Sequence, residues 1–208
     1  EYADLPKLGD WCMANGLKII QILPINDTTA HFDWGDSYPY NAISAFALNP
    51  LYLSPDDALT CCVECSDGAV VETVKDIKSK FDSRGKRLNV KDAVDYEATV
   101  KLKSEYLHEL YSACGKSVIE SESFVRFFAE SQMWLMPYMA FCVLRDRYST
   151  VNFSLWSELS KYDAVQAEQF IKANSTECYF YAFVQYLLDE QLSRARGYAH
   201  QREVALKG

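Results

Sequence analysis

The sequence predicts an α/β fold that is mostly helical in this chain. A helical pattern that ends at a glycine runs directly into a short β-branched segment, and a long aromatic loop follows it. Helical patterns then fill most of the chain up to a strand-like segment at 204–208. A helix followed at once by a buried strand is half of a βαβ unit. The predicted order is therefore helix, strand, long loop, helical insertion, long helix and strand.

Hydrophobic spacing predicts the first helix and the first strand. The helical stripe consists of Leu5, Leu8, Trp11 and Cys12. Asn15 and Gly16 then supply the left-handed backbone conformation that commonly ends a helix. The run 17–24 contains adjacent isoleucines and closes with Pro24. Such a run is typical of a parallel strand that is buried on both faces.

A long loop is expected from Asn26 to Pro55. This stretch is rich in Asp, Thr, Tyr, Asn and Pro, and aromatic residues occur throughout it. Loops at the carboxyl ends of strands commonly bind ligands in α/β folds, because the sheet holds them while their sequences vary. We therefore expect the ligand site of this chain in the loop.

Residues 56–95 have less regular spacing, and the polar run 83–87 predicts an exposed loop. Cys61, Cys62 and Cys65 include one C-x2-C pair, but no second Cys or His pair follows at the spacing of a zinc site. We predict no metal site and expect these thiols in a surface loop.

Helical patterns dominate from Tyr96 onward. The stretch 133–141 is apolar nearly all round and is expected to be buried, with Pro137 marking a kink or the first turn of a new helix. An amphipathic segment near 163–173 and a long helix at about 176–200 follow. The whole insertion is too long for a simple crossover, because one crossover needs about a dozen residues.

Composition and charge exclude two classes of partner. The formal charge is −8, and the basic residues are scattered rather than gathered in a stripe, which argues against nucleic acid. No apolar run approaches the roughly 18 residues of a membrane span. The seven cysteines are odd in number, and several lie in apolar helical patterns. We interpret them as reduced thiols of a soluble cytoplasmic protein. The oligomeric state is left open.

Several sequence blocks, taken in order, resemble a known family. The blocks are Gln21-Ile22-Leu23-Pro24-Ile25-Asn26-Asp27-Thr28, Asp36-Ser37-Tyr38-Pro39-Tyr40, the segment 44–53, Val94-Asp95-Tyr96, 134–141 and 204–208. They are similar to the Gln-x-Leu-Pro strand, Ser-Pro-Tyr loop, Ser-Ala-Phe-Ala-x-Asn-Pro segment and later landmarks of the amylomaltases. The chain therefore resembles the amylomaltase or disproportionating-enzyme family of 4-alpha-glucanotransferases.

Two departures from the bacterial pattern narrow the resemblance. Bacterial members commonly have Pro-Thr-Gly after the strand and Ser directly before Pro-Tyr, whereas this sequence has Asn26-Asp27-Thr28 and Tyr38. These variants resemble the plant cytosolic branch, which acts on maltose and branched heteroglycans. The resemblance implies a cytoplasmic enzyme that passes glucosyl or glucan units between α-1,4-glucans by a retaining mechanism, with no cofactor.

The resemblance also implies a fold and a division of the chain. The expected fold is a partial (β/α)8 TIM barrel with a large helical insertion, since a complete barrel needs about 250 residues. Residues 1–55 would form the first barrel helix, strand and substrate loop, 56–175 the helical insertion, and 176–208 a long helix leading into the next strand. The family's catalytic carboxylates would lie downstream, so no residue here is assigned a catalytic role. We expect the isolated chain to be inactive.

Candidate substrate-binding residues follow from the chemistry of sugars. Glucose rings have apolar faces and hydroxyl rims, so a glucan or maltooligosaccharide site needs flat aromatic rings beside short polar groups. The candidates in the loop are Trp34, Asp36, Ser37, Tyr38, Tyr40 and Asn49. By resemblance, Tyr40 packs on the sugar next to the scissile bond. Asn49 has a second interpretation as a turn residue.

Two other classes of function stay open at this point. A carbohydrate-binding protein without catalysis would keep the aromatic loop, and the downstream sequence would distinguish it from an enzyme. A helical interaction domain would expose the apolar stretch 133–144, and self-association would reveal it.

Overall fold

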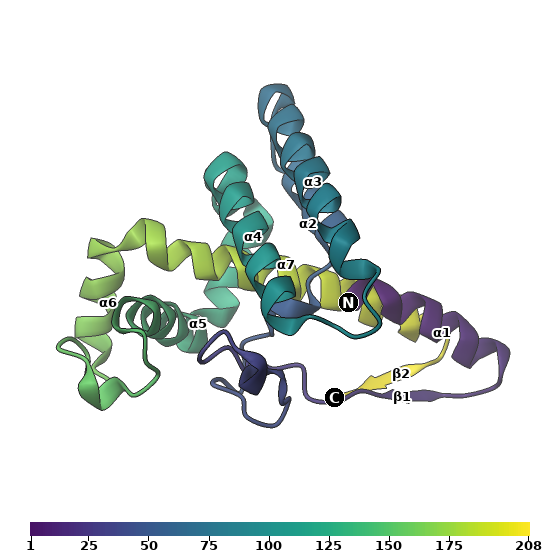
Figure 1. Cartoon of the computed structure of the whole chain (residues 1–208), viewed down its shortest axis with the longest axis horizontal. Coiled ribbons are helices and arrows are strands. Elements are labelled where there is room, and N and C mark those ends of the chain that lie inside the picture. Colours follow the sequence, from purple (N-terminus) through teal and green to yellow (C-terminus); the bar gives the residue numbers. More distant parts are fainter.

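The computed structural model describes residues 1–208 and is predominantly helical (Figure 1). Its helices are α1 Leu5–Ala14, α2 Pro55–Glu64, α3 Gly68–Asn89, α4 Tyr96–Ile119, α5 Glu122–Tyr148, α6 Ala164–Ala173 and α7 Ser175–His200. Its strands are β1 Ile19–Gln21 and β2 Ala205–Lys207. Short 3-10 segments occur at Tyr2–Asp4, Trp34–Ser37, Pro50–Tyr52 and Phe153–Leu155. The predicted order of elements and the mostly helical character are confirmed.

The first helix ends as its sequence predicts, and the strand after it is shorter than predicted. Gly16 has a φ of 71°, the left-handed conformation that glycine adopts without strain. β1 pairs in parallel with β2, and Ile19 lies opposite Ala205. Ile20 is buried but Ile19 is exposed, so the expectation of burial on both faces is wrong. The physical reason is that β1 has one neighbouring strand and its second face carries no packed layer.

Residues 56–95 are mostly helical, because α2 and α3 cover 55–64 and 68–89, so the prediction of less regular structure there is wrong. Ser54 caps α2 by accepting a hydrogen bond from the Asp57 amide. In α3, Val74 and Ile77 recur at helical spacing and are buried. The polar run 83–87 belongs to α3, and Arg84 pairs with Glu105 of α4. The apolar stripe of α3 has only about one residue per helical turn, so the charged residues of the run 83–87 make its helical pattern hard to recognise in the sequence.

The cysteines near residue 61 are also placed differently from the prediction. Cys61 and Cys62 lie buried in α2 rather than in a surface loop. Cys12, Cys142 and Cys178 are buried in their helices, as their apolar surroundings indicated. No group of three or more His, Cys, Asp or Glu side chains is placed to hold a metal ion.

α5 passes through Pro137 without ending. The helix continues because the residues that follow the proline pack into the core, among them the fully buried Met139 and Cys142. Proline removes one backbone hydrogen bond from the helix. Met133 is exposed, so the predicted burial of the whole stretch 133–141 holds only for part of it.

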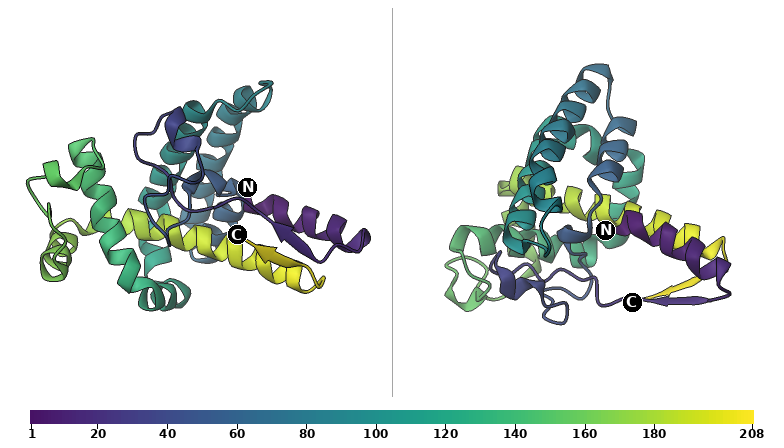
Figure 2. Two further views of the ribbon diagram at one scale, coloured as in Figure 1. Left: turned by 90° about the horizontal axis from the view of Figure 1, so that it is seen from below. Right: turned by 45° about the vertical axis from the view of Figure 1, so that its right-hand side comes forward.

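α7 is the helix around which the others are arranged (Figures 1 and 2). Its C-terminal half lies beside α1, and its N-terminal half packs against α4 and α5. α2, α3 and α4 project to one side of α7, and α6 lies near its N-terminus. The main hydrophobic core joins α2 to α7 with residues of the loop such as Ala47 and Leu53, and a small second core joins α1 and β1 to the end of α7. None of the helices is both long and apolar enough to cross a membrane.

Alanine substitutions at two helical glycines should change the stability of the chain in opposite directions. A Cβ at Gly85 of α3 would meet its nearest neighbour, Leu102, at an ordinary 3.9 Å, whereas a Cβ at Gly115 of α4 would lie 2.4 Å from the Tyr111 ring. Gly85→Ala should stabilise the chain by about 0.5–1 kcal/mol through helix propensity. Gly115→Ala should destabilise it, because Tyr111 packs against Phe180 and cannot move freely. Urea unfolding of both variants measures the difference, and a neutral Gly85→Ala would contradict a helical run at 83–87.

Candidate functional site

The aromatic loop, residues 26–54, is attached to α7 by two buried glutamines. The Gln185 side chain accepts a hydrogen bond from the Leu48 amide at 2.8 Å and donates one to the Leu48 carbonyl at 2.9 Å. Gln191 makes the same pair with Ser54, at 2.7 and 3.0 Å. Each side-chain amide thus satisfies both polar groups of one loop residue, in the way a neighbouring β-strand would.

A buried lysine of α4 binds the same end of the loop. The Lys103 ammonium donates to the carbonyls of Leu51 and Leu53, each at 2.7 Å, and pairs with Glu1 at 2.6 Å. Burial lowers the pKa of Lys103, and the carboxylate of Glu1 opposes that shift. These contacts satisfy three donors of a cation that would otherwise be costly to bury.

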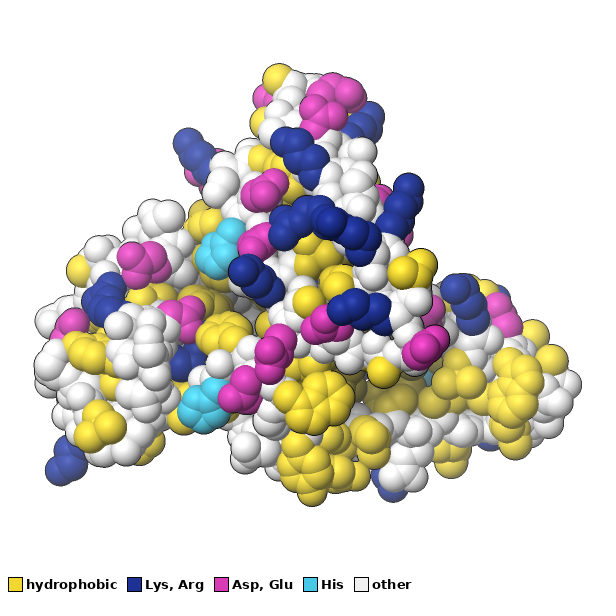
Figure 3. Space-filling model, viewed as in Figure 1, with side chains coloured by type: hydrophobic (Ala, Val, Ile, Leu, Met, Phe, Trp, Pro, Cys, Tyr) yellow, Lys and Arg dark blue, Asp and Glu magenta, His cyan; other side chains and the backbone are white.

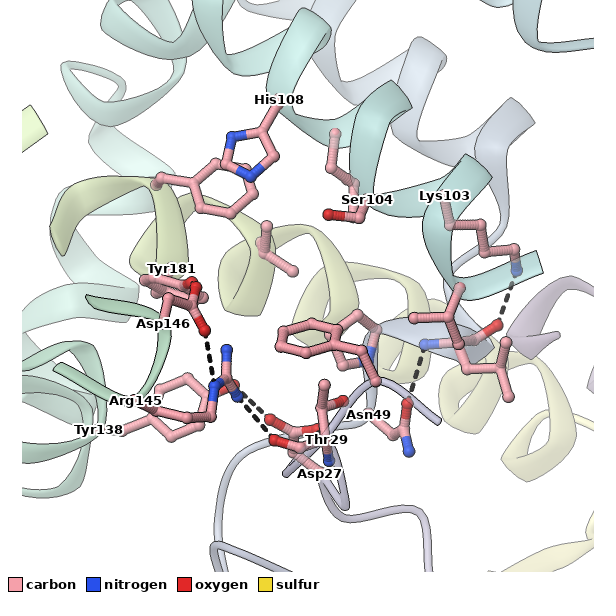
Figure 4. Close-up of a pocket in the computed structure, with 17 residues that line it drawn as sticks. Asp27, Thr29, Asn49, Lys103, Ser104, His108, Tyr138, Arg145, Asp146 and Tyr181 are labelled. Atoms are coloured by element: carbon pink, nitrogen blue, oxygen red, sulfur yellow. Dashed lines mark hydrogen bonds and ion pairs between the residues drawn. The ribbon is translucent and has the colours of Figure 1, made fainter. Parts of the chain in front are cut away.

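α5 holds the first half of the loop through two further side chains (Figure 4). The Tyr138 hydroxyl donates to Asp27 at 2.7 Å, and Asp27 also accepts from the Thr29 amide at 2.9 Å. The Arg145 guanidinium donates to the Thr29 carbonyl at 2.7 Å and pairs with Asp146. Burial raises the pKa of the Asp27 carboxyl, and its hydrogen bonds oppose the rise. α5 and α7 therefore hold opposite ends of one loop.

The centre of the loop is organised by Asp36. One oxygen of its carboxylate accepts hydrogen bonds from the amides of Ala30, His31 and Phe32, at 3.0, 2.8 and 2.7 Å. The Thr28 hydroxyl donates to the Asp36 carbonyl and accepts from the Asn49 side chain. Asp36 and Asn49 were predicted to bind substrate, and the structure buries both of them within the loop.

The other four predicted residues reach the surface. Trp34, Tyr38 and Tyr40 are each 60–63% exposed, and Ser37 is exposed beside them. The rings of Tyr38 and Tyr40 lie 5.4 Å apart with a tilt of 54°. Figure 3 shows hydrophobic side chains gathered along the lower edge of the molecule. Trp34, Tyr38 and Tyr40 expose three aromatic rings within one short segment, so these rings form a candidate platform for a ligand.

Two hollows are lined in part by loop residues, but neither is lined by Trp34, Tyr38 or Tyr40. The one drawn in Figure 4 has about 80 Å³ of space among Asp27, Arg145 and Tyr181, which is less than a ligand pocket usually offers. The second has about 430 Å³, is lined mostly by apolar side chains, and includes Phe46 of the loop stacked on Trp134 of α5 at 6.1 Å. Only the second is large enough for a sugar ring.

Sequence patterns singled out the aromatic residues of the loop and missed the residues that hold the loop in place. The missed residues are Lys103, Tyr138, Arg145, Gln185 and Gln191. A usable signal existed for the glutamines, because Gln185 interrupts the apolar run 182–188 and Gln191 falls on the apolar helix face of Leu187, Leu188 and Ala195. A polar side chain inside an apolar helix face needs a hydrogen-bond partner.

The chain belongs to the 4-alpha-glucanotransferase family known as glycoside hydrolase family 77, whose profile matches residues 1–208. It is 37% identical to the 4-alpha-glucanotransferase DPE2 of Oryza sativa subsp. japonica, over all of this chain and 21% of that protein. It is 31% identical to the 4-alpha-glucanotransferase of Chlamydia pneumoniae, over all of this chain and 36% of that protein.

A solved structure shares the fold. The amylomaltase from Streptococcus agalactiae, determined in complex with acarbose, superposes with a TM-score of 0.69 over 98% of this chain and 38% of that one, at 17% sequence identity. The resemblance to a 4-alpha-glucanotransferase predicted from the motifs is therefore confirmed. The chain spans between about a fifth and two fifths of the length of these relatives.

The attachment of the loop to α7 predicts a large effect of one substitution. Gln185→Leu keeps the size of the side chain but leaves the Leu48 amide and carbonyl without partners. It should lower the free energy of unfolding by about 1–3 kcal/mol. Gln166→Leu on the exposed surface of α6 is the matched control and should change stability by less than about 0.5 kcal/mol. Equal effects of the two variants in urea unfolding would show that the pair to Leu48 does not stabilise the loop.

Proposed function

We propose that this chain supplies glucan-binding subsites to a cytoplasmic 4-alpha-glucanotransferase that moves glucosyl or glucan units between α-1,4-glucans such as maltose, maltooligosaccharides, glycogen or heteroglycan. Membership of the family supports the reaction class. The observation that carries the assignment of subsites is the exposed ring pair of Tyr38 and Tyr40 on a loop that buried side chains hold in place. Seven free cysteines are consistent with a reducing compartment.

The platform has the chemistry that a glucan requires. Tyrosine rings cover the apolar face of a sugar, and their hydroxyls and that of Ser37 meet its hydroxyl rim. We assign Tyr40, Tyr38, Trp34 and Ser37 to glucan contact. Asp36 and Asn49 serve the same site from within the loop, because their side chains are buried among its backbone groups.

The chemical step needs groups that we place outside residues 1–208. Retaining transfer uses an acid/base carboxyl and a nucleophilic carboxylate about 5 Å apart. Asp27 is buried and engaged with Tyr138 and Thr29, so it is not free to attack a sugar. We propose that the longer enzyme supplies both carboxylates and a double-displacement mechanism, with no metal or organic cofactor.

Removal of the Tyr40 ring tests the proposed subsites. In the longer enzyme, Tyr40→Ala should lower kcat/KM for maltooligosaccharide transfer by roughly tenfold or more, the loss expected for one important aromatic contact. Trp11→Ala is the control, because Trp11 is similarly exposed, at 56%, but lies on α1, outside the loop and outside both hollows. An unchanged kcat/KM in Tyr40→Ala would remove Tyr40 from the site.

The isolated chain tests the placement of the chemistry. Incubated with maltose and glycogen, residues 1–208 should release no glucose and form no longer oligosaccharides above the blank. The longer enzyme serves as the positive control. Transfer at enzyme-like rates by the isolated chain would refute the proposal that the catalytic carboxylates lie elsewhere. Binding of maltooligosaccharide without transfer would agree with it.

A further inference from the structure

We propose that Asp36 is a positioning residue for glucan transfer: its carboxylate fixes the loop backbone and so sets where the Tyr38 and Tyr40 rings lie. The inference rests on the proposed function of these rings. It concerns a residue that touches no sugar, and it replaces the sequence-based expectation that Asp36 binds substrate directly.

The protein uses one oxygen of the Asp36 carboxylate for three hydrogen bonds. Its Oδ2 accepts three consecutive backbone amides, those of Ala30, His31 and Phe32, and the side chain belongs to a residue that is only 3% exposed. Successive amides that converge on one oxygen form an anion-binding nest. In this chain the anion is the Asp36 carboxylate, so the nest joins two parts of the same loop. A sugar hydroxyl could reach Oδ2 only if the nest opened.

The nest holds the backbone in a conformation that it would not adopt alone. Phe32 has a φ of 60°, which is rare for a bulky residue and costs free energy. Two contacts oppose that cost: the Phe32 amide donates to Asp36, and the Arg145 guanidinium lies 4.8 Å from the Phe32 ring. The strained residue is therefore held from both sides, by the loop's own carboxylate and by α5.

The position of Asp36 in the chain links the nest to the platform. It lies in the 3-10 segment Trp34–Ser37, with Trp34 two residues before it and Tyr38 two residues after it. The backbone on both sides is also fixed, because Thr28 donates to the Asp36 carbonyl and Asp33 caps the segment through the Gly35 amide. A displacement of Asp36 would therefore move the exposed rings with it.

A double-mutant cycle separates positioning from direct contact. The longer enzyme is assayed for maltooligosaccharide transfer as wild type, as Asp36→Ala, as Tyr38→Ala/Tyr40→Ala, and as the triple variant. Asp36→Ala should lower kcat/KM about tenfold, the factor that corresponds to the net loss of one strong hydrogen bond. When Asp36→Ala is added to the Tyr38→Ala/Tyr40→Ala variant, kcat/KM should fall by less than about threefold further. The reason is that Asp36 acts through the two rings, so the effects of removing Asp36 and removing the rings are not additive.

Each alternative has its own outcome. A tenfold loss from Asp36→Ala in both backgrounds would mean that Asp36 contacts the glucan directly, and would overturn the inference. An unimpaired enzyme without the two rings would refute the proposed function itself. No effect of Asp36→Ala in either background would also overturn the inference.

A milder variant keeps the test valid if Asp36→Ala does not fold. Asp36→Asn retains an oxygen that can face the three amides but loses the charge, which weakens such hydrogen bonds by roughly half. Asp36→Asn should lower kcat/KM about threefold in the enzyme that has both tyrosine rings. The loss should be smaller in the variant that lacks the rings. Asp92→Asn is the matched control, since it removes one charge from an exposed carboxylate between α3 and α4. If Asp92→Asn matched the loss of Asp36→Asn, the charge of the chain rather than the nest would be responsible.

Discussion

The structure depends on hydrogen bonds between buried polar side chains of the helices and the backbone of one long loop. A loop of this length would leave many amides and carbonyls unsatisfied wherever it packs on a hydrophobic core. Gln185 and Gln191 each satisfy both groups of one residue, and Lys103 satisfies two carbonyls more. The loop can therefore lie on the core while its aromatic residues face outward.

This arrangement gives the helices that follow the loop a role that their sequence patterns do not reveal. α4, α5 and α7 share one core, and each contributes a side chain that reaches the loop: Lys103, Arg145 and Gln185. These three helices thus support the candidate glucan site. Preorganised rings lose little conformational freedom when a ligand binds, which is the physical advantage of a supported loop.

Local patterns predicted the parts of the fold that depend on local physics. Gly16 ended α1, and the run 204–208 contained β2. The aromatic residues of the loop were singled out from the chemistry of sugar binding and from the family resemblance. Three features could not be read in this way. The helix at 83–87 was hidden by its charges, Pro137 was overridden by tertiary packing, and the partners of Gln185 lie 137 residues away in the chain. Long-range polar pairs have no periodicity, so no spacing rule reveals them.

Hydrogen exchange of the loop amides tests the account most directly. The Leu48 and Ser54 amides lie in a loop, and their hydrogen-bond acceptors are the side chains of Gln185 and Gln191. Exchange of these two amides should be as slow as that of buried amides within α7, because opening either one requires the loop to leave the core. Exchange as fast as that of exposed loop amides would show that the loop is not held and would contradict the account.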